Sequence, residues 1–434
     1  MGKGGRSLKR LRSSKLTKNT EALLKENKPD QSTEHATCFS CFFWKFKPRE
    51  RNSRLQHGSA SPEETTETEQ SLPKFVDCED GLFVGEYECK ELLGRGSFGY
   101  VFLCEKDENQ FALKILSKSN TITSRQKRLT KGERDIMVQC GDHPSILGLH
   151  EAFQTATHLC LVSDVCSGGE LFFHLEKAGR FNEQRVMVYA AEIASALNFL
   201  HFHGIAYRDL KAENILLDVK GHIKLADFGL ASVSVTEWRG ASSVCGTPAY
   251  ISPDMIFGGG ALGPGYGHAT DWWSLGALMY DMLVGNAPFY HDELVVMCDR
   301  IMHSKLRFPE SRNISPKARS VIEGLLNKVP SQRLGTTSSG GFDALKEHPF
   351  FEGIDWDSRQ VPFFTTDENQ GLINSDNVEK LLHSNFHKSF WSQNVRTCFQ
   401  KINKNVLVES SSYFPGWDFV YISNSDSLTS LDHF

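Results

Sequence analysis

The feature that most constrains the fold is LGRGSFGYV, residues 93–101, in which glycines stand at Gly94, Gly96 and Gly99. The spacing G-x-G-x-x-G also marks dinucleotide-binding folds, where the glycines join a strand to a helix. Here the flanking segments, YECKELLGRG and YVFLCEK, both read as strands. The glycines therefore predict a turn between two strands of a small sheet, and a nicotinamide-dependent oxidoreductase is the weaker alternative.

A lysine follows on the next expected strand. FALKIL comes after the turn residues DENQ and carries Lys114. Backbone amides of a glycine turn, together with a lysine on a neighbouring strand, are an arrangement that holds nucleotide phosphates. The sequence thus predicts a site for a nucleoside triphosphate.

Two polar loops supply the remaining groups that phosphoryl transfer requires. YRDLKAEN contains Asp209, Lys211 and Asn214, and Asp227 opens the DFG that follows the strand-like HIKLA. One carboxylate can accept a hydroxyl proton and a lysine can contact the moving phosphoryl group. An amide and a second carboxylate can hold Mg²⁺. Either loop alone could be an ordinary polar turn, but all four pieces in this order predict phosphoryl transfer.

Composition divides the 434 residues into regions. Ser, Thr, Lys and Glu dominate residues 1–74, which end in an acidic low-complexity run and are expected to be disordered. After the small sheet, helices are expected at RQKRLTKGERDIMVQ, VMVYAAEIASALNFLHFHG and TDWWSLGALMYDMLVG. From residue 352 the apolar density falls again, as in a tail lying over a domain.

Charge is divided along the chain as well. Residues 1–54 hold 14 Lys and Arg against 5 Asp and Glu, a balance of +9, so the net charge of −5 leaves −14 for the rest. An acidic body is expected to attract basic partners and not nucleic acid. Eleven irregularly spaced cysteines and the lack of a membrane-length apolar run predict an intracellular, most simply cytoplasmic, protein.

Residues 87–351 resemble the eukaryotic protein kinases. Tyr207 before Arg208 and Asp209, CGTPAY, DWWSLG and EHPFF are similar to the AGC group, most of all its ribosomal S-six kinase branch with the stress-activated relatives. The resemblance implies an α+β, bilobal fold, with a small five-stranded N-lobe, a larger mainly helical C-lobe, and ATP and Mg²⁺ between them. It also implies an AGC-kinase C-terminal domain with a hydrophobic motif at 352–423, and a tail at 424–434.

The resemblance assigns roles to individual residues. The implied catalytic residues are Lys114, Glu133, Asp209 and Lys211, and the implied magnesium ligands are Asn214 and Asp227. Lys114 is expected to pair with Glu133, on a helix whose position switches the site on or off. The implied ATP-binding residues are Leu93, Gly94, Arg95, Gly96, Ser97, Phe98, Gly99, Tyr100, Val101, Ala112, Lys114, Asp164 and Cys166. A pseudokinase scaffold that binds nucleotide without transferring phosphate is the alternative.

Three carboxylates match family positions that recognise arginines before the phosphorylated residue. They are Glu170 in GGELF, Glu213 in KAEN and Asp281 in MYDM. The guanidinium fork suits such pairing because it engages two oxygens and stays charged. A single surface carboxylate is more often merely solvated, but three on an acidic body favour recognition. With Thr247 facing the acceptor, the expected substrates are protein Ser/Thr residues in Arg-x-Arg-x-x-Ser/Thr contexts.

Two regulatory elements are implied as well. Ser243, two residues before Cys245, matches the position that an upstream kinase phosphorylates in relatives, and neighbouring Ser242 is the alternative. A phosphate at Ser243 would tie the loop to Arg208.

YFPGWDFVY, residues 413–421, matches the hydrophobic motif. Its rings are Phe414, Trp417 and Phe419, and Asp418 stands at the phosphoacceptor position. This cluster is expected to dock beside the GERDIM helix, where Asp418 meets a cation such as Lys127 or Lys131. The alternative is an aromatic tail that simply packs.

Several positions depart from the family. Asp254 of Ser-Pro-Asp replaces a glutamate, so its expected buried pair with Arg333 is one methylene shorter. Ala249 stands where relatives usually carry Glu, and FGGGALGPGYGH, residues 257–268, is a long glycine-rich connection. None of these changes removes a catalytic group.

CFSCFFWKFKPRERNSR, from Cys38 to Arg54, suggests a peripheral membrane contact. Two cysteines, five aromatic residues and trailing cations resemble a palmitoylated segment assisted by charge. A solvated disordered arm, or half of a zinc site, remains the alternative.

Overall fold

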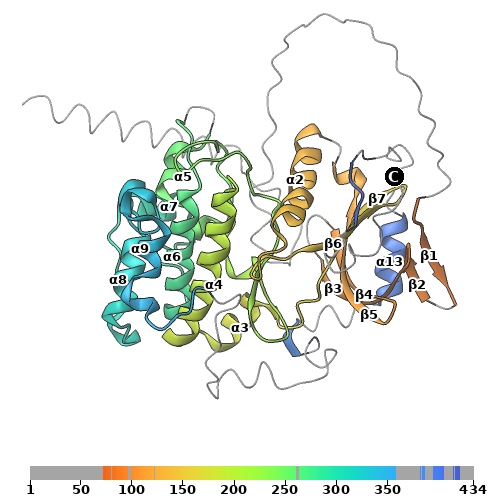
Figure 1. Cartoon of the computed structure of the whole chain (residues 1–434), viewed down its shortest axis with the longest axis horizontal. Helices are drawn as coiled ribbons and strands as arrows, with labels where there is room; N and C mark the ends of the chain where they lie inside the picture. The colour runs from red at the N-terminus through yellow and green to blue at the C-terminus, as the bar shows by residue number, and fades with distance from the viewer. Residues whose placement is uncertain are drawn as a thin grey trace, which may run out of the picture. The chain divides into compact units, whose positions relative to one another are not determined.

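The computed structural model describes residues 72–79, 81–95, 99–121, 123–260, 263–357, 382, 384–386, 394–404, 414 and 416–420. The chain divides into two units, residues 1–72 and 73–434, and the elements below belong to the second. Within it, a β-rich N-lobe precedes a mainly helical C-lobe (Figure 1).

The N-lobe sheet is antiparallel throughout, with strand order β1-β2-β3-β4-β5-β7-β6-β11. Its strands are β1 (Phe75–Cys78), β2 (Gly81–Val84), β3 (Tyr87–Arg95), β4 (Gly99–Lys106), β5 (Asn109–Ser117), β6 (Leu149–Gln154), β7 (His158–Ser163) and β11 (Phe419–Val420). The five expected strands are therefore joined by three more. Two precede the glycine turn, and the third is the C-terminal aromatic segment, which pairs with β6.

Two helices pack close to this sheet. Helix α2 (Ser124–Cys140) begins at a capping box, in which Thr123 accepts from the backbone of Gln126 and the Gln126 side chain accepts in return. Helix α13 (Val395–Lys404) lies beside β1 and β2 in Figure 1. Its buried Phe399 joins the apolar core of the sheet, and Arg396 pairs with Asp77 at 3.2 Å. The C-terminal region thus completes the N-lobe core.

The remaining helices form the C-lobe together with a three-stranded sheet. The helices are α3 (Leu171–Ala178), α4 (Glu183–Phe202), α5 (Pro253–Gly258), α6 (Ala269–Val284), α7 (Leu294–His303), α8 (Pro316–Leu325) and α9 (Gly341–Lys346). The sheet has the order β10-β9-β8, from β8 (Gly169–Glu170), β9 (Ile215–Leu217) and β10 (Ile223–Leu225).

Helix α6 lies in the middle of the C-lobe core. All of its residues are buried except Asp281, which is partly exposed. An apolar helix with one accessible carboxylate can present that group to a ligand while the rest of the helix holds it rigidly. In the part of the chain that the structure describes, no helix combines the length and the apolar character needed to cross a membrane.

Candidate active site

Lys114 and Glu133 form the expected ion pair. Lys114 lies on β5, and its Nζ is 2.6 Å from Oε1 of Glu133 on α2. Burial alone would lower the pKa of Lys114, but Glu133 and Asp227 together raise it above its ordinary value. Lys114 therefore stays protonated, and α2 is fixed to the sheet through this pair.

Asp209 is the centre of the catalytic loop. Its Oδ2 accepts from Nδ2 of Asn214 at 2.8 Å and lies 3.2 Å from Nζ of Lys211. Its Oδ1 accepts from the hydroxyl of Thr247 at 3.3 Å. Burial raises the pKa of Asp209, and Lys211 and Asn214 oppose the rise. The result is a sheltered carboxylate with a lysine beside it and a hydroxyl pointing at it.

Asp271 of α6 holds this loop in place, a role that sequence reasoning did not identify. Its fully buried carboxylate accepts from the backbone amides of Tyr207 at 2.9 Å and Arg208 at 2.8 Å. His201 contacts the same group through Nε2 at 2.8 Å. Arg208 has a positive φ of 68°, a conformation that costs energy in a non-glycine residue and needs such support. DWWSLG contains this aspartate, so the motif itself was the available signal.

Asn214 and Asp227 fit a magnesium site by their chemistry, because Mg²⁺ prefers oxygen ligands. The amide nitrogen of Asn214 is used by Asp209, so its side-chain oxygen is the atom suited to a cation. Asp227 has a φ of 56° and accepts from the backbone of Gly229 at 3.2 Å. Burial raises the pKa of Glu133, and the charge of Asp227 adds to the rise. A divalent cation would relieve this concentration of negative charge.

Several of the expected nucleotide residues lie together. Leu93 of β3 packs in a small apolar cluster, with Val101 and Ala112 partly buried against it. Leu382 and Phe386, from the C-terminal region, belong to the same cluster. Tail residues thus complete the surroundings of these three positions, which the sequence analysis did not anticipate.

The glycine turn itself is described only in part. Gly96, Ser97 and Phe98 lie outside the described residues, whereas Gly94, Arg95, Tyr100 and Val101 lie on β3 and β4. A Cβ at Gly99 would lie 1.8 Å from the carbonyl oxygen of Ile115, so the close pairing of β4 with β5 requires glycine there. The turn therefore joins two strands, as predicted, and no helix follows it.

Asp164 and Cys166, the last two of the expected ATP-binding residues, follow β7. His150 contacts the carboxylate of Asp164 at 2.6 Å, and this hydrogen bond lowers the pKa of Asp164. Cys166 is buried.

The three carboxylates proposed for substrate recognition form one acidic group. Crowding by the surrounding protein, followed by the charge of Glu213, raises the pKa of Glu170 to about 7. Burial also raises the pKa of Glu213, to which Asp281 contributes. Asp281 accepts from the hydroxyl of Tyr250 at 2.6 Å. Glu170 and Glu213, and likewise Glu213 and Asp281, are thus within range of each other's charge, although the three come from β8, the segment before β9, and α6.

Ser243 lies against the catalytic loop. Its hydroxyl accepts from Nη1 of Arg208 at 3.1 Å, whereas its neighbour Ser242 is exposed. The same Nη1 donates to the hydroxyl of Tyr266 at 3.1 Å, and Nε of Arg208 donates to the carbonyl of Leu230 at 2.8 Å. Of the two serines considered, Ser243 is thus the one in contact with the guanidinium.

The aromatic cluster docks on β6 and α2. Trp417 is fully buried, and its Nε1 donates to the carbonyl of Phe153 at 2.9 Å. Phe414 is buried as well, and its ring meets that of Trp417 edge-on at 5.7 Å. Arg134 of α2 lies over the Trp417 ring at 5.9 Å and donates to the carbonyl of Gly416. The cluster thus contacts the helix that carries Glu133.

Two polar residues at this dock were missed by sequence reasoning. Gln154, at the end of β6, accepts from the backbone of Phe414 at 2.8 Å and donates to Oδ2 of Asp418 at 3.2 Å. Lys118 donates to Gln154 at 3.0 Å, and burial lowers its pKa while Asp418 opposes the change. A cation from the segment before α2 therefore acts on Asp418. The expected contact of Asp418 with Lys127 or Lys131 stays a prediction. Phe419 pairs with Ala152 in the sheet.

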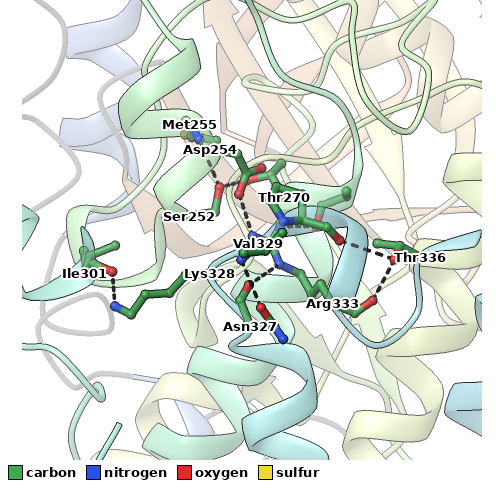
Figure 2. A network of polar contacts seen from close by, with 12 residues as sticks. Ser252, Asp254, Met255, Thr270, Ile301, Asn327, Lys328, Val329, Arg333 and Thr336 are labelled. Carbon is green, nitrogen blue, oxygen red and sulfur yellow. Dashed lines mark hydrogen bonds and ion pairs between the residues drawn. The ribbon is translucent and has the colours of Figure 1, made fainter. Parts of the chain in front are cut away.

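The shortened pair of Asp254 and Arg333 is present (Figure 2). Nη2 of Arg333 lies 2.6 Å from Oδ1 of Asp254, and the guanidinium also donates to the carbonyls of Ala269 and Asn327. Arg333 is fully buried. Its three partners together satisfy the buried guanidinium, so the loss of one methylene is tolerated. The segment from Cys38 to Arg54 lies outside the described residues, so its membrane contact stays a prediction.

Comparisons with known proteins agree with this geometry. Residues 87–351 match the protein kinase domain family. Protein kinase 2 of Dictyostelium discoideum is 46% identical over 274 residues, which are 63% of this chain and 55% of that protein. Serine/threonine-protein kinase SCH9 of Candida albicans is 38% identical over 358 residues, 80% of this chain and 43% of that protein.

Serine/threonine-protein kinase Sgk1 of Danio rerio is 39% identical over 295 residues, 68% of this chain and 66% of that protein. The chain thus spans about half the length of the first two relatives and about two thirds of the third. The family match covers more than half of this chain and includes each residue that the sequence analysis expects to be catalytic. The chain belongs to the protein kinase family, and within it to the AGC group of serine/threonine kinases.

Proposed function

We propose that this protein transfers the γ-phosphate of ATP to serine and threonine residues of proteins, in Arg-x-Arg-x-x-Ser/Thr-like contexts. The observation that carries the proposal is the arrangement around Asp209, whose carboxylate contacts Lys211, Asn214 and Thr247. A buried carboxylate with a raised pKa can accept a proton from a hydroxyl group.

In the proposed reaction the substrate hydroxyl oxygen forms a bond to the γ-phosphorus while the bond to the leaving ADP oxygen breaks. Asp209 accepts the hydroxyl proton, and Lys211, 3.2 Å from Asp209, contacts the moving phosphoryl group. Lys114, oriented by Glu133, contacts phosphates of the nucleotide. Bound Mg²⁺, with Asn214 and Asp227 as ligands, would neutralise charge on the phosphates.

Arginine recognition rests on the acidic group of Glu170, Glu213 and Asp281. Burial raises the pKa of all three carboxylates, and the charge of Glu213 adds to the rise for Glu170 as that of Asp281 does for Glu213. A guanidinium between them would stabilise their charged forms. Asp281 is the accessible residue of a buried helix, which favours a fixed position for one arginine. Thr247, which donates to Asp209, supports a serine or threonine acceptor over tyrosine.

We also propose the regulatory roles of Ser243 and Asp418. A phosphate on Ser243 would meet the guanidinium of Arg208, which already contacts the hydroxyl. Asp418 supplies a permanent negative charge near Lys118 and Gln154, so the aromatic cluster needs no kinase to install one. One carboxylate carries less charge and fewer acceptors than a phosphate, so this contact is weaker.

The experiment that tests the activity measures phosphate transfer from Mg-ATP to four peptides. The first contains Arg-x-Arg-x-x-Ser, the second and third replace one arginine each by Ala, and the fourth replaces Ser by Tyr. We expect kcat/KM to fall at least about tenfold for each arginine removed and transfer to Tyr to be absent.

The variant Glu213→Gln tests the role of the acidic group directly. It should remove much of the preference for arginine while transfer to the Ala-substituted peptides persists. Equal rates on all serine peptides would contradict basic-motif recognition, and no transfer to any peptide would favour the nucleotide-binding scaffold.

A further inference from the structure

The glycine-rich stretch 257–268 comprises the end of α5 and the connection to α6. Its described part, residues 257–260 and 263–268, contacts the activation segment, which runs from Asp227 to Asp254. Ala241 and Tyr266 exchange both backbone hydrogen bonds, at 2.8 and 3.0 Å, and form a short antiparallel bridge. The amide of Gly260 donates to the carbonyl of Ser242 at 2.6 Å. The backbone of residues 241–242 in the activation segment is thus hydrogen-bonded to the connection.

The end of the connection contacts an earlier part of the same segment. The amide of His268 donates to the carbonyl of Thr236 at 3.1 Å, and that of Ala269 donates to the carbonyl of Glu237 at 3.2 Å. The side chain of Glu237 accepts from the amide of Thr337 at 2.7 Å. The segment is therefore held at two places, around residues 236–237 and around residues 241–242.

Glycine is required where the two backbones meet. A Cβ at Gly267 would lie 2.1 Å from the carbonyl oxygen of Glu237 and 2.3 Å from that of Thr236. A Cβ at Gly259 would lie 2.5 Å from a methyl group of Val244. Since real Cβ atoms do not approach backbone oxygens this closely, any other residue at 267 would push the connection away from the segment.

Tyr266 connects this contact to the catalytic loop. Its side chain is buried, and its hydroxyl donates to the carbonyl of Ser243 at 2.5 Å while accepting from Arg208 at 3.1 Å. Among the described residues, no carboxylate forms an ion pair with the guanidinium of Arg208, although Asp271 accepts from the Arg208 backbone amide. Tyr266 therefore holds both the backbone at the modification position and the guanidinium that a phosphate would meet.

We propose that residues 257–260 and 263–268 are a built-in clamp that holds the activation segment in place while Ser243 is unmodified, with Tyr266 as its positioning residue. In relatives of this kind a phosphate is expected to do this work. Here the phosphate on Ser243 would strengthen a position that the clamp already provides. The inference rests on the proposed function for its kinetic consequences, but not for the contacts themselves.

The test uses the phosphatase-treated 434-residue chain and measures hydrogen exchange of residues 236–245. The variants are Gly267→Ala, which separates the backbones, and Tyr266→Phe, which removes one hydroxyl. Gly132→Ala is the control, because a Cβ there meets nothing within 4 Å. We expect exchange in this stretch to rise roughly tenfold in both variants and to stay unchanged in the control.

A kinetic arm separates positioning from general destabilisation. Tyr266→Phe should raise KM for the peptide at least about threefold while KM for ATP stays within about twofold, since the segment faces the protein substrate. Ser243→Ala should keep at least about a third of the activity of the unaltered, phosphatase-treated protein.

Unchanged exchange in both Gly267→Ala and Tyr266→Phe would overturn the clamp. So would a Ser243→Ala variant whose segment exchanges as fast as that of Gly267→Ala. If Gly267→Ala does not fold, Tyr266→Phe still decides the question. Absence of transfer by the unaltered protein would instead count against the proposed activity, because hydrogen exchange does not depend on catalysis.

Discussion

The catalytic loop, residues 207–214, and the aromatic cluster, residues 414–420, are both fixed by residues far away in the chain, but by opposite kinds of interaction. The loop is held by the buried carboxylate of Asp271, which accepts hydrogen bonds from two of its backbone amides. The cluster is held by the equally buried ring of Trp417, whose Nε1 donates a hydrogen bond to the carbonyl of Phe153.

The difference predicts how each region fails. Removing a buried acceptor leaves its donors unsatisfied in a low-dielectric interior, which costs more than the hydrogen bonds contributed. Removing a ring loses apolar burial and leaves a cavity, but the segment can leave the surface without disturbing the rest. The geometry of the catalytic loop should therefore depend on the charge of Asp271. The attachment of the aromatic cluster should depend on the apolar area that Trp417 buries.

The largest expected effect is that of Asp271→Ala. The amides of Tyr207 and Arg208 and the ring of His201 would lose their common partner. We expect the free energy of unfolding to fall by about 3–5 kcal/mol, measured by urea denaturation. Asp271→Asn, which keeps the shape and one acceptor, should recover part of the loss. A loss below about 1 kcal/mol would show that the loop does not depend on this charge.

Trp417→Ala should come next. Loss of its burial and of the hydrogen bond to Phe153 should release β11 and remove the contact with Arg134 on α2. Because α2 carries Glu133, kcat/KM should fall about tenfold or more. The free energy of unfolding should change much less than in Asp271→Ala. Val420→Ala, an exposed residue on the same strand, is the control and should have little effect. Equal losses of kcat/KM in Trp417→Ala and Val420→Ala would contradict an attachment that depends on the tryptophan ring.

Asp418→Ala should have a smaller effect, about two- to fivefold in kcat/KM, because its carboxylate is exposed and such pairs contribute about 1 kcal/mol or less. Asp418→Asn keeps an acceptor for Gln154 but removes the charge that acts on Lys118. If charge matters, both variants should lose activity and the difference from the unaltered protein should shrink at high salt. If only the acceptor matters, Asp418→Asn should behave like the unaltered protein.

A pH dependence should come from the acidic group of Glu170, Glu213 and Asp281. Crowding by protein atoms, and then Glu213, raises the pKa of Glu170 to about 7, so below that pH the group is neutral and attracts arginine less. Preference for an arginine-containing peptide over its Ala-substituted form should therefore increase as the pH rises from 6 to 8, by roughly two- to fivefold. Glu170→Gln should flatten this increase. An increase of the same size in that variant would assign it to another group.

The sequence could bring together three of the proposed catalytic-site residues because they are neighbours in the chain. Asp209, Lys211 and Asn214 fall within one loop, and the structure brings them into contact. Lys114 and Glu133 were paired through the family resemblance, and their 2.6 Å contact is present. The helix around DWWSLG was also predicted correctly, because it carries a long apolar run. The helix around GERDIM is present as predicted, although it is mostly polar and buries few of its residues.

What the sequence did not reveal depends on contacts between distant segments. Strand β11 pairs with β6 across more than 250 residues, and no pattern in two residues announces such pairing. Gln154 and Lys118 acquire their roles only because the aromatic cluster docks beside them. Tyr266 lies in a glycine-rich connection that reads as a loop, and its burial follows from the backbone contacts of its neighbours.

The central claim is that Asp209 makes this chain a working kinase and not only a nucleotide-binding scaffold. The most direct measurement compares Mg-ATP binding by calorimetry with phosphate transfer to the Arg-x-Arg-x-x-Ser peptide, for the unaltered protein and Asp209→Asn. We predict similar Kd values for Mg-ATP in both, and transfer that falls at least about a hundredfold in the variant. Equal binding with equally low transfer in both proteins would contradict the claim.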